Sequence, residues 1–276
     1  MMAPFSKMHG LGNDFVVLES LTQNIHINPT MVRKISDRHT GIGCDQLLVI
    51  APPGDGACDF SVRYFNADGS EAEQCGNGLR CAARYVFDKK FTGKRSLQLQ
   101  TATGVMAVDI NDDNSITANM GQPELEPAQV PFSAVQRSVL YPIEVDGDHY
   151  QIGVVSMGNP HAVLKVPCVA NAEVAALGPK LEQHPRFCNR VNVGFMQIES
   201  RQHINLRVHE RGAGETKACG TGACAAVVAG IQQQLLESSV RVSLPGGALT
   251  IEWSGEGHSL SMTGPAVNVF NGYIKI

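Results

Sequence analysis

The sequence of 276 residues has few aromatic side chains, one tryptophan and little net charge. Aromatic residues make up 6% of the chain, and the formal net charge is −4 with no block of like charges. Nucleic acids and anionic membrane surfaces are bound by basic patches, so neither partner is expected. No apolar run approaches the roughly 18 residues that span a bilayer. The N-terminus has no signal-peptide pattern, and we expect a soluble, cytoplasmic protein.

The cysteines lack the spacing of a zinc site. The eight cysteines stand at positions 44, 58, 75, 81, 168, 188, 219 and 224. No C-x2-C or H-x3-H pair occurs, and a cytosolic chain of this length does not need disulfide staples. We therefore expect no metal and a set of free thiols, some of them reactive. Cys58 and Cys168 are interpreted as strand or loop residues, Cys81 and Cys224 as core residues, and the role of Cys44 is left open.

Two of the cysteines belong to an internal repeat. The segments "QCGNGLRC" and "ACGTGACA" place Cys75 and Cys219 144 positions apart (219 − 75), each before Gly-x-Gly and an apolar run. The further matching pairs, at 144 or 146 positions, are Asn66 and Glu210, Asn13 and Asn159, and Gln46 and Asn192. Four pairs in one order at nearly one distance indicate a duplication of about 145 residues.

Most of the remaining pattern predicts short strands separated by Gly, Asp and Asn. The predicted strands are "DFSVRYF", "SLQLQT", "VMAVDI", "YQIGVVSM", "HINLRVHE", "SVRVSL", "LTIEW" and "HSLSMTG". The runs after the two Gly-x-Gly motifs, "LRCAARYVFD" and "ACAAVVAGIQQQLL", are apolar around most of a helix and predict buried helices. Two further helices are expected after Asn28-Pro29 and after Asn171, with asparagine as the N-cap.

These elements predict an α+β fold with two pseudo-symmetric domains, each a mostly antiparallel or mixed sheet wrapped round a central helix. The first domain is expected to contain residues 1–120 plus 265–276, and the second residues 121–264, with the active site in the cleft between them. The tail "AVNVFNGYIKI" is expected to complete the sheet of the first domain.

The cysteine before each helix has a chemical use. Unpaired N–H groups and partial positive charge at a helix N-terminus attract a carboxylate and favour a thiolate. Inverting a carbon stereocentre requires a base on one face and an acid on the other, which two repeated thiols can supply. This chemistry requires no cofactor, although a Schiff-base lysine for pyridoxal phosphate stays open. Read singly, either motif also fits a plain glycine turn beside a small core cysteine.

The motifs resemble those of diaminopimelate epimerase over nearly the whole chain. The segments that carry the resemblance include "FSKMHGLGNDF", "DRHTGIGCDQLLV", "FNADGSEAEQCGNGLRC", "VVSMGNPHAV", "RVNVGFMQI" and "VHERGAGETKACGTGACAA". The resemblance implies a cofactor-independent, homodimeric epimerase. Such an enzyme interconverts LL- and meso-2,6-diaminopimelate, on the route to lysine and the peptidoglycan cross-link.

The resemblance also implies which residues act. Cys75 and Cys219 are expected to be the acid/base pair, with His161 and Glu210 managing their protons. The residues expected to hold the substrate are Asn13, Gln46, Asn66, Gly76, Asn77, Asn159, Asn192, Glu210, Arg211, Gly220 and Thr221. Arg211 suits the distal carboxylate, because a guanidinium binds a carboxylate with two hydrogen bonds. Read singly, the four asparagines also fit turn residues, and His161 fits a structural histidine.

Three other functions remain open from the residues. A proline or hydroxyproline racemase has the same duplicated architecture but needs no anchor for a second amino-acid head group. Cysteines 144 positions apart can also meet as a redox disulfide. A non-catalytic amino-acid binding protein is the third alternative, and the presence of both cysteines argues against it.

Overall fold

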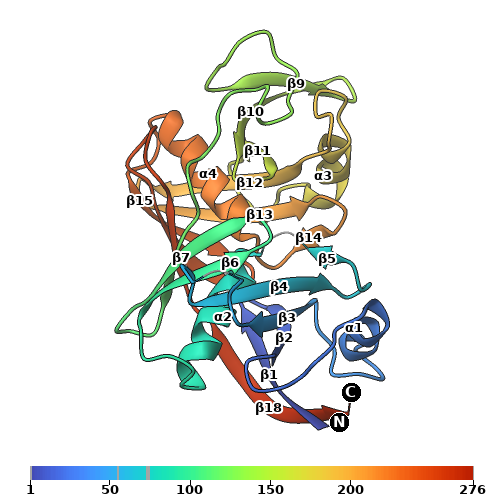
Figure 1. Ribbon diagram of the computed structural model, residues 1–276. Helices are drawn as coiled ribbons and strands as arrows, with labels where there is room; N and C mark the ends of the chain where they lie inside the picture. The colour runs from blue at the N-terminus through green and yellow to red at the C-terminus, as the bar shows by residue number, and fades with distance from the viewer. Residues whose placement is uncertain (1, 55, 73–74, 276) are drawn as a thin grey trace. The chain divides into compact units, whose positions relative to one another are not determined.

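The computed structural model describes residues 2–54, 56–72 and 75–275, which form two compact units (Figure 1). Unit 1 comprises Met1–Asn119 with Thr263–Ile276, and unit 2 comprises Met120–Met262. The sequence analysis put the division after residue 120 and the return to the first domain at residue 265. Each unit combines a mixed sheet with two helices among the described residues, so the predicted α+β class is confirmed.

Unit 1 is built on one mixed sheet. Its elements are β1 (Met2–Gly10), β2 (Asn13–Glu19), α1 (Pro29–Ser36), β3 (Gln46–Ala51), β4 (Phe60–Asn66), β5 (Glu71–Ala72), α2 (Gly76–Asp88), β6 (Ser96–Thr101), β7 (Gly104–Ile110), β8 (Ile116–Asn119) and β18 (Val267–Lys275). The strands pair in the order β18–β1–β2–β3–β4–β6–β7–β8, antiparallel except for β2 with β3 and β4 with β6. Because β18 pairs with β1, the prediction for the tail is confirmed.

Unit 2 repeats this arrangement. Its elements are β9 (Tyr141–Val145), β10 (Asp148–Ser156), β11 (Pro160–Lys165), α3 (Val174–Glu182), β12 (Asn192–Ser200), β13 (His203–Glu210), β14 (Gly214–Thr216), α4 (Gly220–Gln232), β15 (Ser239–Leu244) and β16 (Gly247–Glu252), with β17 (Ser261–Gly264) at its boundary. The strands pair in the order β9–β10–β11–β12–β13–β15–β16, and β11–β12 and β13–β15 are the parallel pairs.

The repeat holds at the level of strand register. Phe15 lies opposite Gln46 in the parallel pair β2–β3, and His161 lies opposite Asn192 in the parallel pair β11–β12. Both members are shifted by 146 positions (161 − 15 and 192 − 46). Strands β6 and β15 even share one alternation of buried and exposed residues, as expected for strands with one face in a core.

A buried helix lies at the centre of each unit. Ten of the thirteen residues are buried in α2 and also in α4, so both helices are enclosed on most sides. Helix α2 packs against β1, β2, β7 and β8, and α4 packs against β10, β11, β12 and β16 (Figure 1). Cys81 and Cys224 are fully buried in these helices, which confirms the prediction that they are core residues.

The two shorter helices begin differently. The Asn28 side chain caps α1 by accepting from the Met31 N–H at 3.0 Å, with Pro29 in the first turn, as predicted. The prediction that Asn171 caps α3 is wrong. A turn lies in between, closed by hydrogen bonds from Ala172 N to Val169 O at 3.2 Å and from Val174 N to Ala172 O at 2.8 Å, and the helix starts after Glu173.

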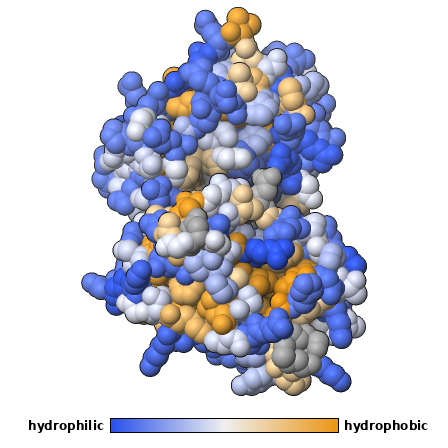
Figure 2. Space-filling model, viewed as in Figure 1, coloured by the Kyte–Doolittle hydropathy of each residue, from blue (hydrophilic) through white to orange (hydrophobic). Residues whose placement is uncertain are grey.

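The surface is mostly hydrophilic in the view of Figure 2, with apolar residues reaching it in patches. On β18, Val267, Val269, Phe270 and Tyr273 are exposed. In the part of the chain that the structure describes, no helix is both long enough and apolar enough to span a membrane.

Candidate active site

Each repeated cysteine is the last extended residue before its central helix. Cys75 has φ −144° and ψ 112°, and Cys219 has φ −118° and ψ 111°. The first helical hydrogen bonds run from Leu79 N to Cys75 O at 2.8 Å and from Ala223 N to Cys219 O at 3.0 Å. The backbone N–H groups of the first turn therefore point beyond the helix end, beside the thiol. The two predicted catalytic cysteines thus share one local geometry.

The glycines that follow the cysteines let each helix pack closely. A Cβ on Gly78 would lie 2.8 Å from Tyr64 Cε1 and 3.2 Å from Phe15 Cε1. A Cβ on Gly222 would lie 3.2 Å from Val208 Cγ2 and 3.3 Å from Cys219 Sγ, which is a milder conflict. Packing against the sheet therefore restricts position 78 to glycine more strongly than position 222.

Three predicted residues of unit 1 meet at one atom. Cys75 Sγ donates to Asn13 Oδ1 at 3.4 Å, and Asn77 Nδ2 donates to the same oxygen at 3.3 Å. The fully buried Arg80 fixes Asn77 and Gly76 by donating to Asn77 Oδ1 at 2.7 Å and to Gly76 O at 3.3 Å. Asn13, Gly76 and Asn77 are thus brought to Cys75.

A second pair of predicted residues forms at the ends of β3 and β4. Gln46 Nε2 donates to Asn66 Oδ1 at 3.0 Å, and Asn66 Nδ2 donates to Ser70 Oγ at 3.1 Å. Gln46 Oε1 is buried without a hydrogen-bond partner among the described residues, as is the hydroxyl of Tyr64. A buried acceptor of this kind is suited to a donor on a ligand.

Cys219 has an acidic neighbour. It is 4% exposed, and its Sγ lies 3.6 Å from Thr221 Oγ1. Burial raises the pKa of the Cys219 thiol well above its ordinary value, and the nearby charge of Glu210 raises it further. Glu210 in turn accepts a hydrogen bond from the Thr216 hydroxyl. Thr221 and Glu210 are thus brought to Cys219. Gly220, the next residue, packs closely against Met262, because a Cβ on Gly220 would lie 3.1 Å from Met262 Sδ.

His161 is a neutral imidazole at pH 7. Burial, and then the charge of Arg211, lower the pKa of His161 to about 3. Its Nε2 lies 3.0 Å from Asn159 Oδ1, and its Nδ1 is buried without a partner among the described residues. With the proton on Nε2, Nδ1 is left as an acceptor.

Arg211 and Asn192 are held together by the backbone. Arg211 N donates to Asn192 Oδ1 at 3.0 Å, and Asn192 Nδ2 donates to Pro160 O at 2.9 Å. The exposed guanidinium of Arg211 uses one nitrogen to donate to Asn189 O at 2.9 Å. Its other donors face solvent, where a carboxylate can reach them.

The loop that carries Arg211 rests on a buried pair that the sequence analysis missed. His209 Nε2 lies 2.8 Å from Glu182 Oε2, and Gly212 N donates to Glu182 Oε1 at 3.0 Å. Burial disfavours the charge on Glu182, but the hydrogen bonds from His209 and Gly212, together with the nearby charges of His209 and Arg190, outweigh it and lower the pKa of Glu182. The signal that could have found this pair was a glutamate beside Leu181, near the end of the helix expected after Asn171.

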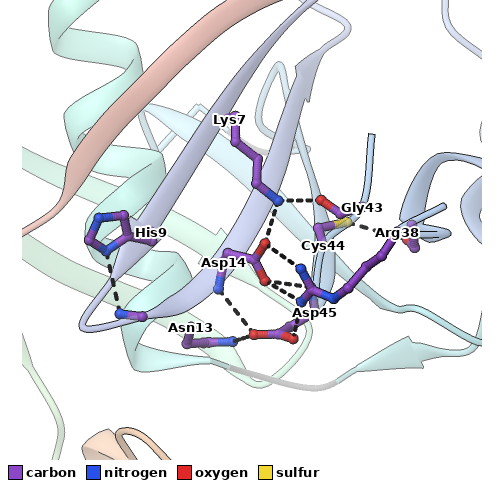
Figure 3. A network of polar contacts seen from close by, with 10 residues as sticks. Lys7, His9, Asn13, Asp14, Arg38, Gly43, Cys44 and Asp45 are labelled. Atoms are coloured by element: carbon purple, nitrogen blue, oxygen red, sulfur yellow. Dashed lines mark hydrogen bonds and ion pairs between the residues drawn. The ribbon is translucent and has the colours of Figure 1, made fainter. Parts of the chain in front are cut away.

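A charged network in unit 1 was also missed (Figure 3). Asp14 accepts hydrogen bonds from Lys7 and Arg38, and Arg38 also donates to Asp45 Oδ1 at 2.7 Å. Burial opposes the ionisation of Asp14, but the bonds from Arg38 and Lys7 hold its pKa well below the usual range. Asp45 also accepts from Asn13 Nδ2 at 3.0 Å, which ties the network to the predicted site. The signal was an aspartate directly before Gln46.

No group of three or more His, Cys, Asp and Glu side chains within residues 2–54, 56–72 and 75–275 is arranged to hold a metal ion. The eight cysteines are free thiols, of which Cys188 is exposed. Cys44 is buried and lies 3.4 Å from Ser36 Oγ, so it is a core residue in this structure.

Comparison with known proteins gives one consistent family. The family model described as "Diaminopimelate epimerase" matches residues 5–126 and 153–269. Diaminopimelate epimerase of Ectopseudomonas mendocina (strain ymp) is 54% identical over 276 residues, covering 100% of both chains. Among solved structures, a probable proline racemase from Agrobacterium radiobacter K84 has a TM-score of 0.71 at 14% identity, covering 99% of this chain and 93% of that one. A hydroxyproline epimerase from Agrobacterium vitis has a TM-score of 0.70 at 15% identity, covering 99% and 92%. At such identities the two structures show the fold alone.

Proposed function

The chain belongs to the diaminopimelate epimerase family, and from this premise we propose that it interconverts LL- and meso-2,6-diaminopimelate without a cofactor. Cys75 and Cys219 form the acid/base pair. The observation that carries the proposal is that both thiols stand at the same point of a repeated unit, directly before a buried helix. A substrate polar at both ends also suits the unengaged donors of Arg211.

The proposed reaction needs one thiolate and one thiol. The thiolate takes the α-proton, so that the C–H bond breaks and an S–H bond forms. The opposite thiol gives its proton to the other face of the carbon, and the configuration is inverted. The thiolate and the thiol have then exchanged roles, and the reverse reaction uses the same groups.

The helix ends stabilise the charge that develops when the α-proton leaves. That charge spreads onto the α-carboxylate, which the backbone N–H groups of Gly76, Asn77, Gly220 and Thr221 bind in this proposal. The first turns of α2 and α4 direct these groups past the helix ends. No step requires a metal or a cofactor.

The remaining predicted residues hold the rest of the substrate. Arg211 binds the distal carboxylate, and Glu210 accepts from an ammonium group. Gln46 Oε1, which has no hydrogen-bond partner among the described residues, offers a further acceptor. His161, with its pKa lowered to about 3, acts in this proposal through hydrogen bonds and not as a cation.

The test is incubation of LL-diaminopimelate in deuterated water, with deuterium and configuration at the α-carbon followed by NMR. We expect meso product that carries deuterium at the inverted centre. The variant Cys168→Ala is the control, because Cys168 lies outside the proposed site, and it should behave as the wild type. Turnover of proline at a comparable rate, or inversion without deuterium uptake, contradicts the proposal.

We also propose a cytoplasmic homodimer, as the sequence analysis expects. The exposed apolar side chains of β18 support a protein–protein contact there. Tyr273, 71% exposed, is the largest of them, and Tyr273→Glu should shift the molar mass in solution toward a monomer. Light scattering after gel filtration measures this, and a wild-type mass of one chain contradicts the homodimer.

A further inference from the structure

Asp45 lies next to the proposed acid/base site but has no role in the mechanism above. Its Oδ2 accepts from Asn13 Nδ2 at 3.0 Å and from Asp14 N at 3.1 Å, while its Oδ1 binds Arg38 (Figure 3). A carboxylate has only acceptors, so it selects the NH2 end of the Asn13 carboxamide. The oxygen of that carboxamide must then face the other way.

The oxygen of Asn13 faces the Cys75 thiol. Cys75 Sγ and Asn77 Nδ2 both donate to Asn13 Oδ1, at 3.4 Å and 3.3 Å. If the Asn77 carboxamide flipped, it would lose the hydrogen bond that its oxygen accepts from the buried Arg80 at 2.7 Å. The direction of the hydrogen bonds through Asn13 and Asn77 is therefore set by the Asp45 carboxylate at one end and the Arg80 guanidinium at the other.

We propose that Asp45 is a positioning residue, which orients the Asn13 carboxamide so that its oxygen accepts the Cys75 S–H and keeps Cys75 as the proton donor of the resting enzyme. This inference rests on the proposed function of Cys75. Unit 2 has no such device. Val191, 146 positions later (191 − 45) and fully buried, occupies the place of Asp45. Asn159 Oδ1 lies instead against His161.

The titratable and charged groups near Cys75 are Tyr64, Cys81, Arg80 and His9. Burial, and then the charge of Cys75, raise the pKa of Tyr64. Burial also raises the pKa of Cys81 to about 12, so both stay uncharged over the working range. Arg80 is a fixed cation on α2. His9, near the end of β1, accepts from Gly12 N at 3.4 Å. The donors to the Asp45 carboxylate are Asn13, Asp14 and Arg38, and none of these four groups is among them.

The test compares three variants. Asp45→Leu removes the acceptor for Asn13. Asp45→Asn keeps an acceptor oxygen but loses the charge, and Arg38→Leu removes the ion pair but keeps the carboxylate. The rate at which iodoacetamide alkylates Cys75 is measured from pH 7 to pH 10 by mass spectrometry of peptides, in a Cys219→Ala background. Exposed Cys188 is the internal reference, and Asp59→Leu, which breaks a separate pair with Lys94, is the matched control.

We expect the alkylation profile of Cys75 to move to lower pH in Asp45→Leu alone, because a freed carboxamide can turn its NH2 group toward the thiolate. The rate at pH 7 should rise about 10- to 150-fold, the range that one hydrogen bond to a charged group supports. The other variants should follow the parent profile. An unmoved profile in Asp45→Leu overturns the proposal, and so does an equal shift in Arg38→Leu or Asp59→Leu, which would indicate a structural effect.

The same variants, made with Cys219 intact, separate this inference from the proposed function. Asp45→Leu should lower kcat/KM for diaminopimelate roughly 10- to 100-fold, with rescue by Asp45→Asn. A shifted alkylation profile with full epimerase activity leaves the positioning role standing and contradicts the acid/base role of Cys75. Lost activity with an unmoved alkylation profile contradicts the positioning role of Asp45 and leaves the acid/base role of Cys75 standing.

Discussion

Cys75 and Cys219 begin equivalent helices of the two units, but their neighbours differ in charge. Cys75 is half-buried and donates to the neutral carboxamide of Asn13. Cys219 is buried, and the carboxylate of Glu210 adds to burial in raising its pKa. The duplication thus repeats the backbone around each thiol while the side chains give each thiol its own electrostatics.

An epimerase that works in both directions needs each thiol as acid in one direction and as base in the other. Burial favours the thiol form of Cys219, and the charge of Glu210 adds to this preference. In the proposed complex the substrate ammonium pairs with Glu210 and offsets that charge. The Cys219 thiolate would then become accessible only when substrate is bound, whereas Asn13 acts on Cys75 before binding.

The largest expected effect comes from removing one thiol. Cys75→Ser and Cys219→Ser should each lower the epimerisation rate about 10²- to 10⁴-fold, because a serine hydroxyl is a far weaker base at neutral pH. The remaining thiol should still exchange the α-proton of a single stereoisomer for deuterium, which NMR detects. The two variants should prefer opposite stereoisomers. Exchange of the same stereoisomer by both would place the thiols on one face and break the comparison.

The next largest effect is a pH dependence of stability that His161 gives to unit 2. Phe15 of unit 1 and His161 of unit 2 occupy equivalent register positions, and only the histidine titrates. The pKa of His161 falls from 6.5 to about 3 on folding, so below pH 6.5 the unfolded chain binds the extra proton. The stability that depends on a neutral His161 is therefore full above pH 6.5 and is lost as pH falls toward 3.

His161→Phe should reduce this acid sensitivity. Between pH 7 and pH 4.5 the wild type should lose about 2–3 kcal/mol more unfolding free energy than the variant, measured by urea titration at each pH. The exposed His149 provides the control, and His149→Gln should keep the wild-type slope. Equal slopes in all three proteins would mean that His161 is not protected from protonation.

The glycines test how tightly each central helix is packed. Gly78→Ala places a methyl group 2.8 Å from the Tyr64 ring and should cost about 1–3 kcal/mol of unfolding free energy. Gly222→Ala meets its neighbours at 3.2 Å and 3.3 Å, and the better helix propensity of alanine offsets more of the cost. Urea unfolding of the two variants compares them. A larger loss at Gly222 would reverse the difference that the geometry predicts.

A smaller effect concerns the charge beside Cys219. Glu210→Gln removes the anion that raises the pKa of the thiol, so the reactivity profile of Cys219 should shift to lower pH. At a fixed pH, modification by a small methanethiosulfonate should therefore be faster than in the wild type. Cys75, followed in the same digest, should not change. A parallel change at Cys75 would show that Glu210 does not act on one thiol alone.

The family and the isomerase class could be predicted because the motifs resemble those of diaminopimelate epimerase, and the fold could be predicted from the internal repeat and the strand pattern. "SLQLQT" and "SVRVSL" alternate with the period of a strand and are β6 and β15. The charged networks were not predictable in this way. Lys7, Asp14, Arg38 and Asp45 come from three separate turns and strands, and Glu182 reaches His209 across 27 positions (209 − 182). Such contacts depend on which loops meet in space, which spacing alone does not specify.

The caps show the same limit at short range. Asn28 and Asn171 both precede a helical pattern, but only Asn28 is followed by proline, whose fixed φ suits the first turn. After Asn171 the chain makes a further turn before α3 begins at Val174. One local signal placed the helix, and a second was needed to place its first residue.

The smallest predicted effect follows from this contrast between α1 and α3. Asn28→Ala removes the side-chain oxygen that accepts from Met31 N at 3.0 Å and leaves that N–H to water. The loss should be about 1 kcal/mol of unfolding free energy. Glu173, the N-cap residue of α3, makes no capping bond through its side chain, so Glu173→Ala should change stability by less than about 0.5 kcal/mol. Asn28→Asp is the matched control, because its carboxylate can still accept from Met31 N and also suits the positive end of the helix. Urea titrations of the three variants at pH 7 measure the differences. Equal losses in Asn28→Ala and Asn28→Asp would show that α1 depends on packing of its buried Val32 and Ile35 and not on the cap.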